Sequence, residues 1–227
     1  MTRAIRCACW LAGALLLSAE TLDRIAVTVD RHVISERDVA QDVRISAFLD
    51  AKPLDAAGPA FDATLLRNAA DRLIDQYLVL QDAALTRVTL ASAADAAPLL
   101  ASIRERYSSD AQYRAALAQA GIGEAELNSH LLAGLRMLRY TDIRFRPEAQ
   151  VTEEAMRAYY ATLRGQGGRS FEESRPQIER LLTDQQVMKS LDSWLSMTRS
   201  EAQIVYRDPA LRDAAPPAGT SGSGVAP

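Results

Sequence analysis

The stretch that decides the fold is Arg24-Ile25-Ala26-Val27-Thr28-Val29-Asp30-Arg31-His32-Val33-Ile34, near the start of a 227-residue chain. Residues 24–29 have an alternating pattern and are rich in β-branched side chains, which predicts a strand. Asp30-Arg31 predicts a turn, and residues 32–34 predict a second short strand. A third run of this kind, Gln203-Ile204-Val205-Tyr206, lies near the other end. Three such short strands need one another to form a sheet. We therefore expect the last strand to join the first hairpin and tie both ends of the chain into one lobe.

The sequence between these strands has helical periodicity. Ser35, followed by Asp38 three residues later, indicates a capping box that starts a helix towards Leu49. A second helix begins after Asp62, and further helices are predicted from Ser92, Ser108, Glu124 and Thr152. The residues expected on the inner faces are Leu66, Ala70, Leu73, Tyr77, Leu80, Ala84, Leu99, Leu100, Ile103, Leu127, Leu131, Leu135 and Leu138. The predicted fold class is mostly α, with a small antiparallel sheet formed by the N-terminal hairpin and the C-terminal strand.

A glycine-rich segment separates this region from the last helix. Gly165-Gln166-Gly167-Gly168 is typical of a linker. Beyond it, Ser174 and Gln177 indicate a capping box with Pro176 in the first turn of a long helix that ends near Arg199. The tail after Asp208 is rich in Ala, Pro, Gly and Ser, so residues 209–227 are predicted to be disordered.

The first nineteen residues have the pattern of a secretory signal peptide. Arg3 and Arg6 precede an apolar run from residue 7 to 17, and Ala19 offers a cleavage point. The run is short for a membrane span, although an uncleaved leader that anchors the chain in a membrane is the alternative. Both cysteines lie in this leader, so the exported chain is expected to contain no thiol. Removal of the two arginines takes the net charge from −3 to −5, which gives no reason to expect nucleic acid as a partner.

The sequence shows little that predicts catalysis. His32 and His130 lie far apart, and neither has a second histidine at metal-ligand spacing, so a polar structural role is the simpler interpretation. The glycines at 165–168 lie between two helices, a context that does not suit a phosphate-binding loop. Acidic pairs such as Glu153-Glu154 fall at helix starts, where the helix dipole accounts for them. No catalytic residue, metal site or cofactor is therefore expected.

Methionine and aromatic residues on the helices offer a possible surface for polypeptide binding. Methionine adapts its shape and aromatic rings accept many sequences, which suits the capture of unfolded segments. Ordinary core packing is the competing interpretation for each of these residues. The candidate client-binding residues are Met137, Tyr140, Met156, Tyr159 and Tyr160.

Four segments, in order, resemble the SurA family of periplasmic chaperones. The hairpin and helix start at 23–39 resemble the opening of its N-terminal region, and 71–81, with Leu73-Ile74-Asp75 and Gln81, is similar to its next helix. Phe171-Glu172-Glu173-Ser174-Arg175-Pro176-Gln177-Ile178 resembles the start of the family's last helix, and 194–206 resembles its ending. The resemblance implies a helical chaperone core of the SurA N-terminal type, related to the C-terminal part of trigger factor. It also implies binding of extended, unfolded outer-membrane or secreted proteins.

The chain departs from this family at one place. Its members usually carry one or two parvulin domains before the last helix, where this chain has only residues 164–169, and a domain needs on the order of 50 residues. The expected organisation is a signal peptide at 1–19, a chaperone domain at 20–208 and a tail at 209–227. Within the domain, the N-terminal part covers 20–164, the linker 165–169 and the C-terminal helix and strand 170–208.

Three functions remain open from the sequence. The first is a periplasmic, ATP-independent holdase whose partners are unfolded or extended polypeptides, with neither nucleic acid binding nor stable membrane insertion after leader cleavage. The second is a dedicated adaptor or assembly subunit of one envelope or secretion machine. The third, peptidyl-prolyl cis-trans isomerase activity, is the family's usual label, but the domain that would carry it is missing.

Overall fold

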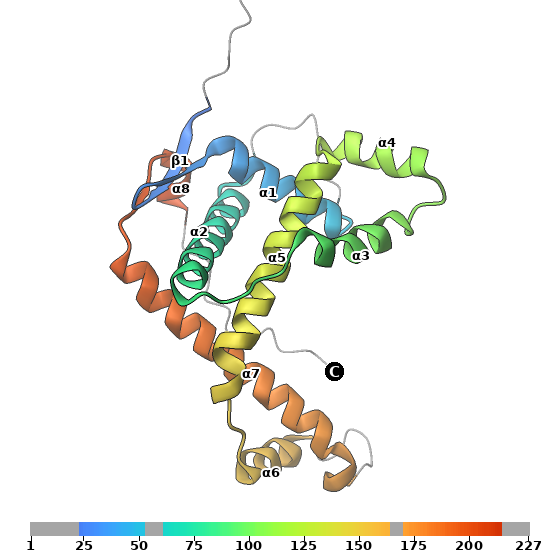
Figure 1. The fold of residues 1–227 in the computed structure, drawn as a ribbon, viewed down its shortest axis with the longest axis vertical. Helices are drawn as coiled ribbons and strands as arrows, with labels where there is room; N and C mark the ends of the chain where they lie inside the picture. Colours follow the sequence, from blue (N-terminus) through green and yellow to red (C-terminus); the bar gives the residue numbers. More distant parts are fainter. Residues whose placement is uncertain (1–22, 53–60, 164–169, 215–227) are drawn as a thin grey trace, which may run out of the picture.

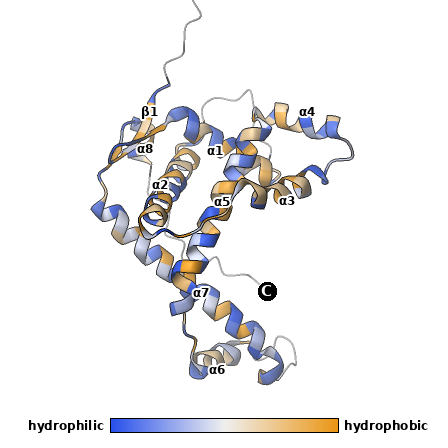
Figure 2. Cartoon of the chain, viewed as in Figure 1, coloured by the Kyte–Doolittle hydropathy of each residue, from blue (hydrophilic) through white to orange (hydrophobic). Residues whose placement is uncertain are grey.

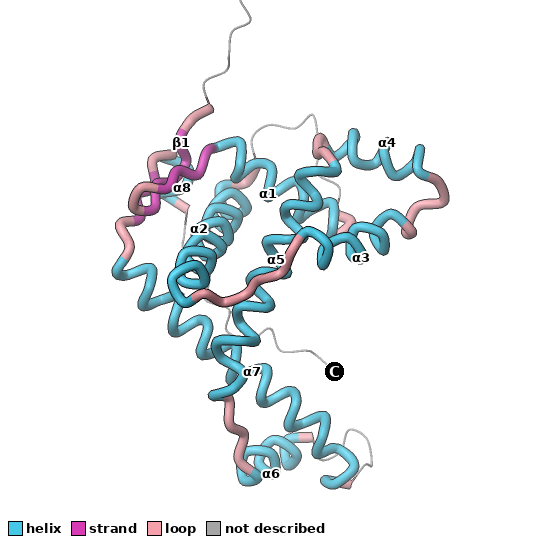
Figure 3. Tube along the Cα trace, in the orientation of Figure 1, coloured by secondary structure: helices cyan, strands magenta, loops and turns pink. Residues whose placement is uncertain are grey.

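The computed structural model describes residues 23–52, 61–163 and 170–214, and these residues form a mostly helical fold with one small antiparallel sheet (Figure 1). The predicted fold class is confirmed. Figure 3 shows the strands gathered at one end of the molecule, with helices making up most of the remainder. The elements are β1 (Ile25–Val29), β2 (His32–Ser35), α1 (Glu36–Leu49), α2 (Ala63–Thr86), α3 (Ala93–Arg104), α4 (Asp110–Ala120), α5 (Glu124–Phe145), a 3₁₀ turn (Arg146–Glu148), α6 (Glu153–Thr162), α7 (Phe171–Glu201), β3 (Ile204–Tyr206) and α8 (Pro209–Asp213).

The sheet joins the two ends of the described chain. Its strand order is β2-β1-β3, and Val27 of β1 is paired with Ile34 on one side and Tyr206 on the other. The tight turn after β1 places Asp30 at a φ of 52°, a conformation that aspartate tolerates better than most residues. The prediction that the last strand completes the first hairpin is confirmed.

Three packed clusters of apolar side chains follow one another through the molecule. The first lies between the sheet, α1 and α2, and contains Val27 and Ile74. The second joins the end of α1 to α3, α4 and the start of α5, around Tyr113. The third joins the ends of α2 and α5 to α7, around Tyr140 and Leu191. α2 contributes to the first and third clusters and therefore connects the sheet to α7, whereas α5 contributes to the second and third and connects α3 and α4 to α7.

The first part of α7 packs against α6 beyond these clusters, at the lower end of the molecule in Figure 1. Met156 of α6 and Ile178 of α7 are buried there. Farther along α7, Leu181, Met188 and Met197 are exposed. Figure 2 shows hydrophilic and hydrophobic residues interspersed along α7.

The start of α7 differs from the prediction. Its N-cap is Ser170, whose hydroxyl accepts from the Glu173 N–H while the Glu173 carboxylate accepts from the Ser170 N–H at 2.7 Å. The predicted capping box at Ser174 is therefore wrong, and Pro176 lies inside the helix. The earlier start is favoured because it brings Phe171 against the Tyr160 ring, with centroids 5.5 Å apart.

The predicted disordered tail is also wrong for its first residues. Pro209 to Asp213 form α8, capped by the Asp208 carboxylate, which accepts from the Ala210 N–H at 2.9 Å. Leu211 is fully buried in the cluster beneath the sheet. Burial of one large apolar side chain stabilises the turn against the general preference of this composition for disorder. The rest of the predicted tail, the leader and the linker lie outside the described residues.

Several residues predicted on inner helix faces are exposed instead. Leu99 of α3 and Leu138 of α5 are 39% and 60% exposed. The buried face of α5 changes along the helix because its first half contacts α1 and α3 whereas its second half contacts α2 and α7. Leu127 is buried in the first half, and Tyr140 and Phe145 in the second.

Candidate binding pocket

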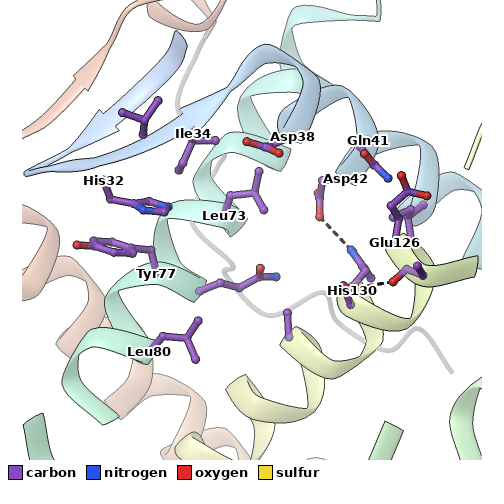
Figure 4. Close-up of a pocket in the computed structure, with 16 residues that line it drawn as sticks. His32, Ile34, Asp38, Gln41, Asp42, Leu73, Tyr77, Leu80, Glu126 and His130 are labelled. Carbon is purple, nitrogen blue, oxygen red and sulfur yellow. Dashed lines mark hydrogen bonds and ion pairs between the residues drawn. The ribbon is translucent and has the colours of Figure 1, made fainter. Parts of the chain in front are cut away.

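A pocket of about 680 Å³ opens between β2, α1, α2 and α5 (Figure 4). This volume falls within the roughly 300–1,000 Å³ of ligand pockets in proteins. β2 and α1 are consecutive in the chain, whereas α2 and α5 follow later, and the pocket exists because these segments pack around the first two clusters. Its lining consists of His32, Val33, Ile34, Asp38, Gln41, Asp42, Ile45, Leu73, Gln76, Tyr77, Leu80, Ala125, Glu126, Ser129, His130 and Ala133.

The start of α1 determines which of its residues reach the pocket. Ser35 and Asp38 form the predicted capping box, in which the Ser35 hydroxyl accepts from the Asp38 N–H at 3.1 Å. The helix therefore begins directly after β2. Asp38, Asp42 and Ile45 then follow at spacings of four and three residues, which places them along one helix face. Val39 and Val43 point into the core beside that face.

The wall contributed by α2 is mostly apolar and aromatic, with Gln76 as its polar residue. Leu73, Tyr77 and Leu80 were predicted on the inner face of this helix. In the structure they line the pocket and are not in the most buried part of the core. Ile74 and Leu78 are among the enclosed positions of α2. Two adjacent apolar stripes therefore run along α2, one facing the core and one facing the pocket.

An aromatic pair forms one end of the pocket. The His32 ring of β2 stacks on the Tyr77 ring of α2, with centroids 4.2 Å apart and planes 5° from parallel. Val33, beside this pair, is 49% exposed. Figure 4 shows His32 and Tyr77 at this end, with Leu80 nearby on α2.

The opposite end is polar and carries a buried carboxylate. Asp42 is 4% exposed, and its Oδ2 accepts from Arg72 Nε at 3.1 Å. His130 Nδ1 of α5 lies 3.1 Å from Asp42 Oδ1, although that oxygen accepts no well-aligned hydrogen bond. Figure 4 shows Glu126 at this same end. The pocket therefore has an aromatic, apolar end and an acidic end.

The turn before α5 brings this helix to the pocket. Gly121 ends α4 with a φ of 67°, in the left-handed region that glycine adopts without strain. Gly123 then caps α5, where its N–H donates to Glu126 Oε2 at 2.6 Å. A Cβ at Gly123 would lie 2.1 Å from that oxygen, so a side chain there would displace Glu126. Glu126, Ser129 and His130 consequently share the α5 face towards the pocket.

The serine in the pocket lining is engaged within its own helix. The Ser129 hydroxyl donates to the Ala125 carbonyl of its own helix at 2.9 Å. Among the residues that the structure describes, no group of three or more histidine, cysteine, aspartate or glutamate side chains could hold a metal ion. Within the same ranges, no helix combines the length and apolar character needed to cross a membrane.

The residues predicted to bind clients do not form one surface. Tyr140 is fully buried, and its hydroxyl donates to Asp82 Oδ2 at 2.6 Å. This burial, together with the Asp82 carboxylate, holds the pKa of Tyr140 far above its ordinary value. Met137 is half-buried against the same cluster. These two residues are therefore core residues on α5, as the simpler interpretation allowed.

The other three candidates lie on α6. Met156 is buried, whereas Tyr159 and Tyr160 are half-buried. Tyr160 packs edge-on against Phe171 of α7. None of the five candidate residues lines the pocket.

Sequence reasoning did not select the two histidines or Asp42 as a site. The sequence contained one local indication of this site. Asp42 is an acidic residue between the apolar positions Val39 and Val43, on a helix face that should be buried. Its partners Arg72 and His130 come from other helices, so their convergence follows only from the tertiary packing.

The fold is that of a helical protein with a small three-stranded sheet, and its pocket has one aromatic, apolar end and one acidic end. Neither a family model nor a curated protein sequence matches the chain. The resemblance to SurA-type chaperones therefore depends on the four sequence segments alone.

Proposed function

We propose that this protein is an ATP-independent holdase that binds extended segments of unfolded outer-membrane or secreted proteins in the periplasm. Residues 1–19 would direct its export, and the clients would bind in the pocket between β2, α1, α2 and α5. The four SurA-like segments, taken in order, support this proposal. Such a protein acts by mass action, because it lowers the free concentration of aggregation-prone chains.

The single observation that carries the proposal is that an apolar pocket wall continues into the free edge of a strand. In the order β2-β1-β3, β2 has a partner strand on one side only among residues 23–52, 61–163 and 170–214. The Asp30 N–H, directly after β1, donates to the Gln203 carbonyl, and the Ala26 carbonyl accepts from the Arg207 N–H. Every second residue from Ala26 to Asp30 therefore directs its main-chain groups towards β3.

The main-chain N–H and C=O groups of Val27 and Val29 in β1 therefore point towards β2, where these residues are paired with Ile34 and His32. By the alternation of antiparallel strands, the main chain of Val33 then faces away from β1. An unpaired strand edge beside an apolar pocket suits an extended polypeptide, since the main chain can pair while side chains enter the pocket.

Suppression of aggregation tests the proposal. A denatured outer-membrane protein is diluted into buffer with and without the exported chain, and light scattering is recorded without ATP. Dose-dependent suppression at near-stoichiometric ratios is expected. A folded sample that suppresses nothing would reject the holdase and favour the dedicated adaptor, for which one stoichiometric partner should co-purify.

A matched pair of variants on α2 locates the site. Leu80→Ser alters the pocket wall, whereas Leu85→Ser makes the same change at a position that is 80% exposed and outside the pocket. We expect Leu80→Ser to weaken suppression and Leu85→Ser to leave it unchanged, with circular dichroism confirming that both variants fold. Equal suppression by the two variants would exclude this pocket as the client site.

A further inference from the structure

We infer that the polypeptide segments this pocket takes carry a lysine or arginine beside apolar residues, an inference that rests on the proposed function. The pocket lining contains three carboxylates, from Asp38, Asp42 and Glu126, and neither lysine nor arginine. Its other ionisable side chains are His32, His130 and Tyr77. An apolar pocket with this charge is complementary to a cationic occupant.

The contacts within the protein leave acceptor capacity on these carboxylates. Asp38 uses Oδ2 to accept from the Ser35 N–H and hydroxyl, at 3.0 and 2.9 Å. Glu126 likewise uses Oε2 for the Gly123 N–H. Among the described residues, no hydrogen bond or ion pair occupies Asp38 Oδ1 or Glu126 Oε1.

Asp42 adds a buried charge that is only partly balanced. Arg72 binds its Oδ2 and also donates to Ser46 Oγ at 3.2 Å, but Arg72 does not line the pocket. The remaining oxygen, Oδ1, has His130 as its neighbour and no well-aligned hydrogen bond. Because Oδ1 is itself enclosed, Asp42 acts on an occupant of the pocket through its charge and not through a direct hydrogen bond.

The apolar end and the acidic end of the pocket together favour a side chain that has both an apolar part and a positive charge. Lysine and arginine have an apolar stem and a charged head, and they lay the stem along apolar surface while the head reaches polar groups. Here the stem would pass Leu73 and Tyr77 and the head would reach Asp38 and Glu126. Figure 4 shows Glu126 at the end away from His32 and Tyr77, and Asp38 between the two ends. The neighbouring apolar residues of the segment would contact Leu80 and Val33.

Short fluorescein-labelled peptides of alternating valine and serine, with one central lysine, norleucine or glutamate, test this inference by fluorescence anisotropy. We expect the lysine peptide to bind roughly three- to tenfold more tightly than the norleucine peptide, the range that two solvent-accessible charge pairs supply. The glutamate peptide should bind most weakly. The lysine preference should decrease as salt is added, because salt screens accessible charges.

A pair of double variants assigns the preference to this pocket. Asp38→Asn with Glu126→Gln removes two charges while keeping an oxygen that can cap each helix, and it should bring the ratio of lysine to norleucine affinities close to one. Glu179→Gln with Glu201→Gln removes two exposed charges on α7 and should keep the ratio of the unmodified protein.

Three results would overturn the inference. These are equal affinities for the lysine and norleucine peptides, a lysine preference that survives in the pocket variant, and the absence of binding by any peptide. The aggregation assay decides the proposed function separately. A protein that suppresses aggregation without preferring lysine would remain a holdase with a charge-indifferent site.

Discussion

Arg199 of α7 donates from Nη1 to Asp71 Oδ1 of α2 at 3.1 Å, although 128 residues separate them in the chain. The same oxygen accepts from the Tyr206 hydroxyl of β3 at 2.7 Å, and Oδ2 accepts from Arg67 Nε at 3.0 Å. Asp71 is 4% exposed. One buried carboxylate therefore joins α2 to α7 and β3.

Asp71→Ala should lower the free energy of unfolding by about 3 kcal/mol, because it leaves the partly buried Arg67 without a carboxylate partner and Arg199 with Asp75 alone. Glu179→Ala, on the exposed face of α7, is the control and should change stability by less than about 0.5 kcal/mol. Urea denaturation followed by circular dichroism measures both variants. Similar losses in the two would show that Asp71 does not hold the C-terminal elements in place.

A chain truncated after residue 169 should lose cooperative unfolding. Without β3, Val27 of β1 has no partner on one side, and without α7 the third cluster lacks Val187 and Leu191. Thermal melting by circular dichroism and calorimetry tests this dependence. A truncated chain that melts as sharply as the full chain would show that residues 23–163 fold independently.

Leu211→Ala should destabilise the protein by about 2–5 kcal/mol, the usual cost of truncating a fully buried leucine. Leu211 is enclosed beneath the sheet, and its carbonyl accepts from Arg67 Nη1 at 2.8 Å. Leu85→Ala is the matched control, since Leu85 is 80% exposed. If the two variants unfold at the same urea concentration, α8 contributes nothing to the core.

The sequence predicted those features that depend on neighbours along the chain. The alternation in 24–29 predicted β1, and Ser35, Asp62, Ser92 and Thr152 were each predicted correctly as helix starts. Caps and alternation are local because the residues that form them are within four positions of each other.

The pocket could not be predicted in the same way because it depends on the choice between two apolar stripes. On α2, the stripe with Leu73 and Tyr77 and the stripe with Ile74 and Leu78 both have helical spacing. Only the placement of the sheet and α5 decides that the first stripe borders a cavity and the second is enclosed. For the same reason, Tyr140 and Met156 were candidates for a surface although both are buried.

Two serines near the start of α7, Ser170 and Ser174, each have the sequence pattern of a helix cap, and substitutions can distinguish them. Ser170→Ala should cost about 1 kcal/mol, because the Ser170 hydroxyl caps the Glu173 N–H. Ser174→Ala should have a smaller effect, since Ser174 lies within the helix. Urea denaturation of both variants gives the comparison. A larger loss for Ser174→Ala would indicate that the helix begins at the later capping box in solution.

Tyr206→Phe should change how stability depends on alkaline pH. Burial, followed by the hydrogen bond to Asp71, raises the pKa of Tyr206 to about 12, compared with about 10 in an unfolded chain. A raised folded-state pKa gives stability that is fully present below pH 10 and is lost as the pH rises through 12. The variant lacks this titration, so the stability difference between the two proteins should shrink over that interval.

Urea unfolding at a series of pH values, with phenolate absorbance recorded in parallel, measures this difference. The unmodified protein should be more stable than Tyr206→Phe at neutral pH, because the hydroxyl donates to a buried carboxylate that otherwise loses a donor. Tyr140 also has a raised pKa, but it is present in both proteins and its titration cancels in the comparison. A difference that stays constant from pH 9 to 12 would mean that Tyr206 ionises as readily in the folded protein as in the unfolded chain, and that its bond to Asp71 does not help to close the sheet onto α2.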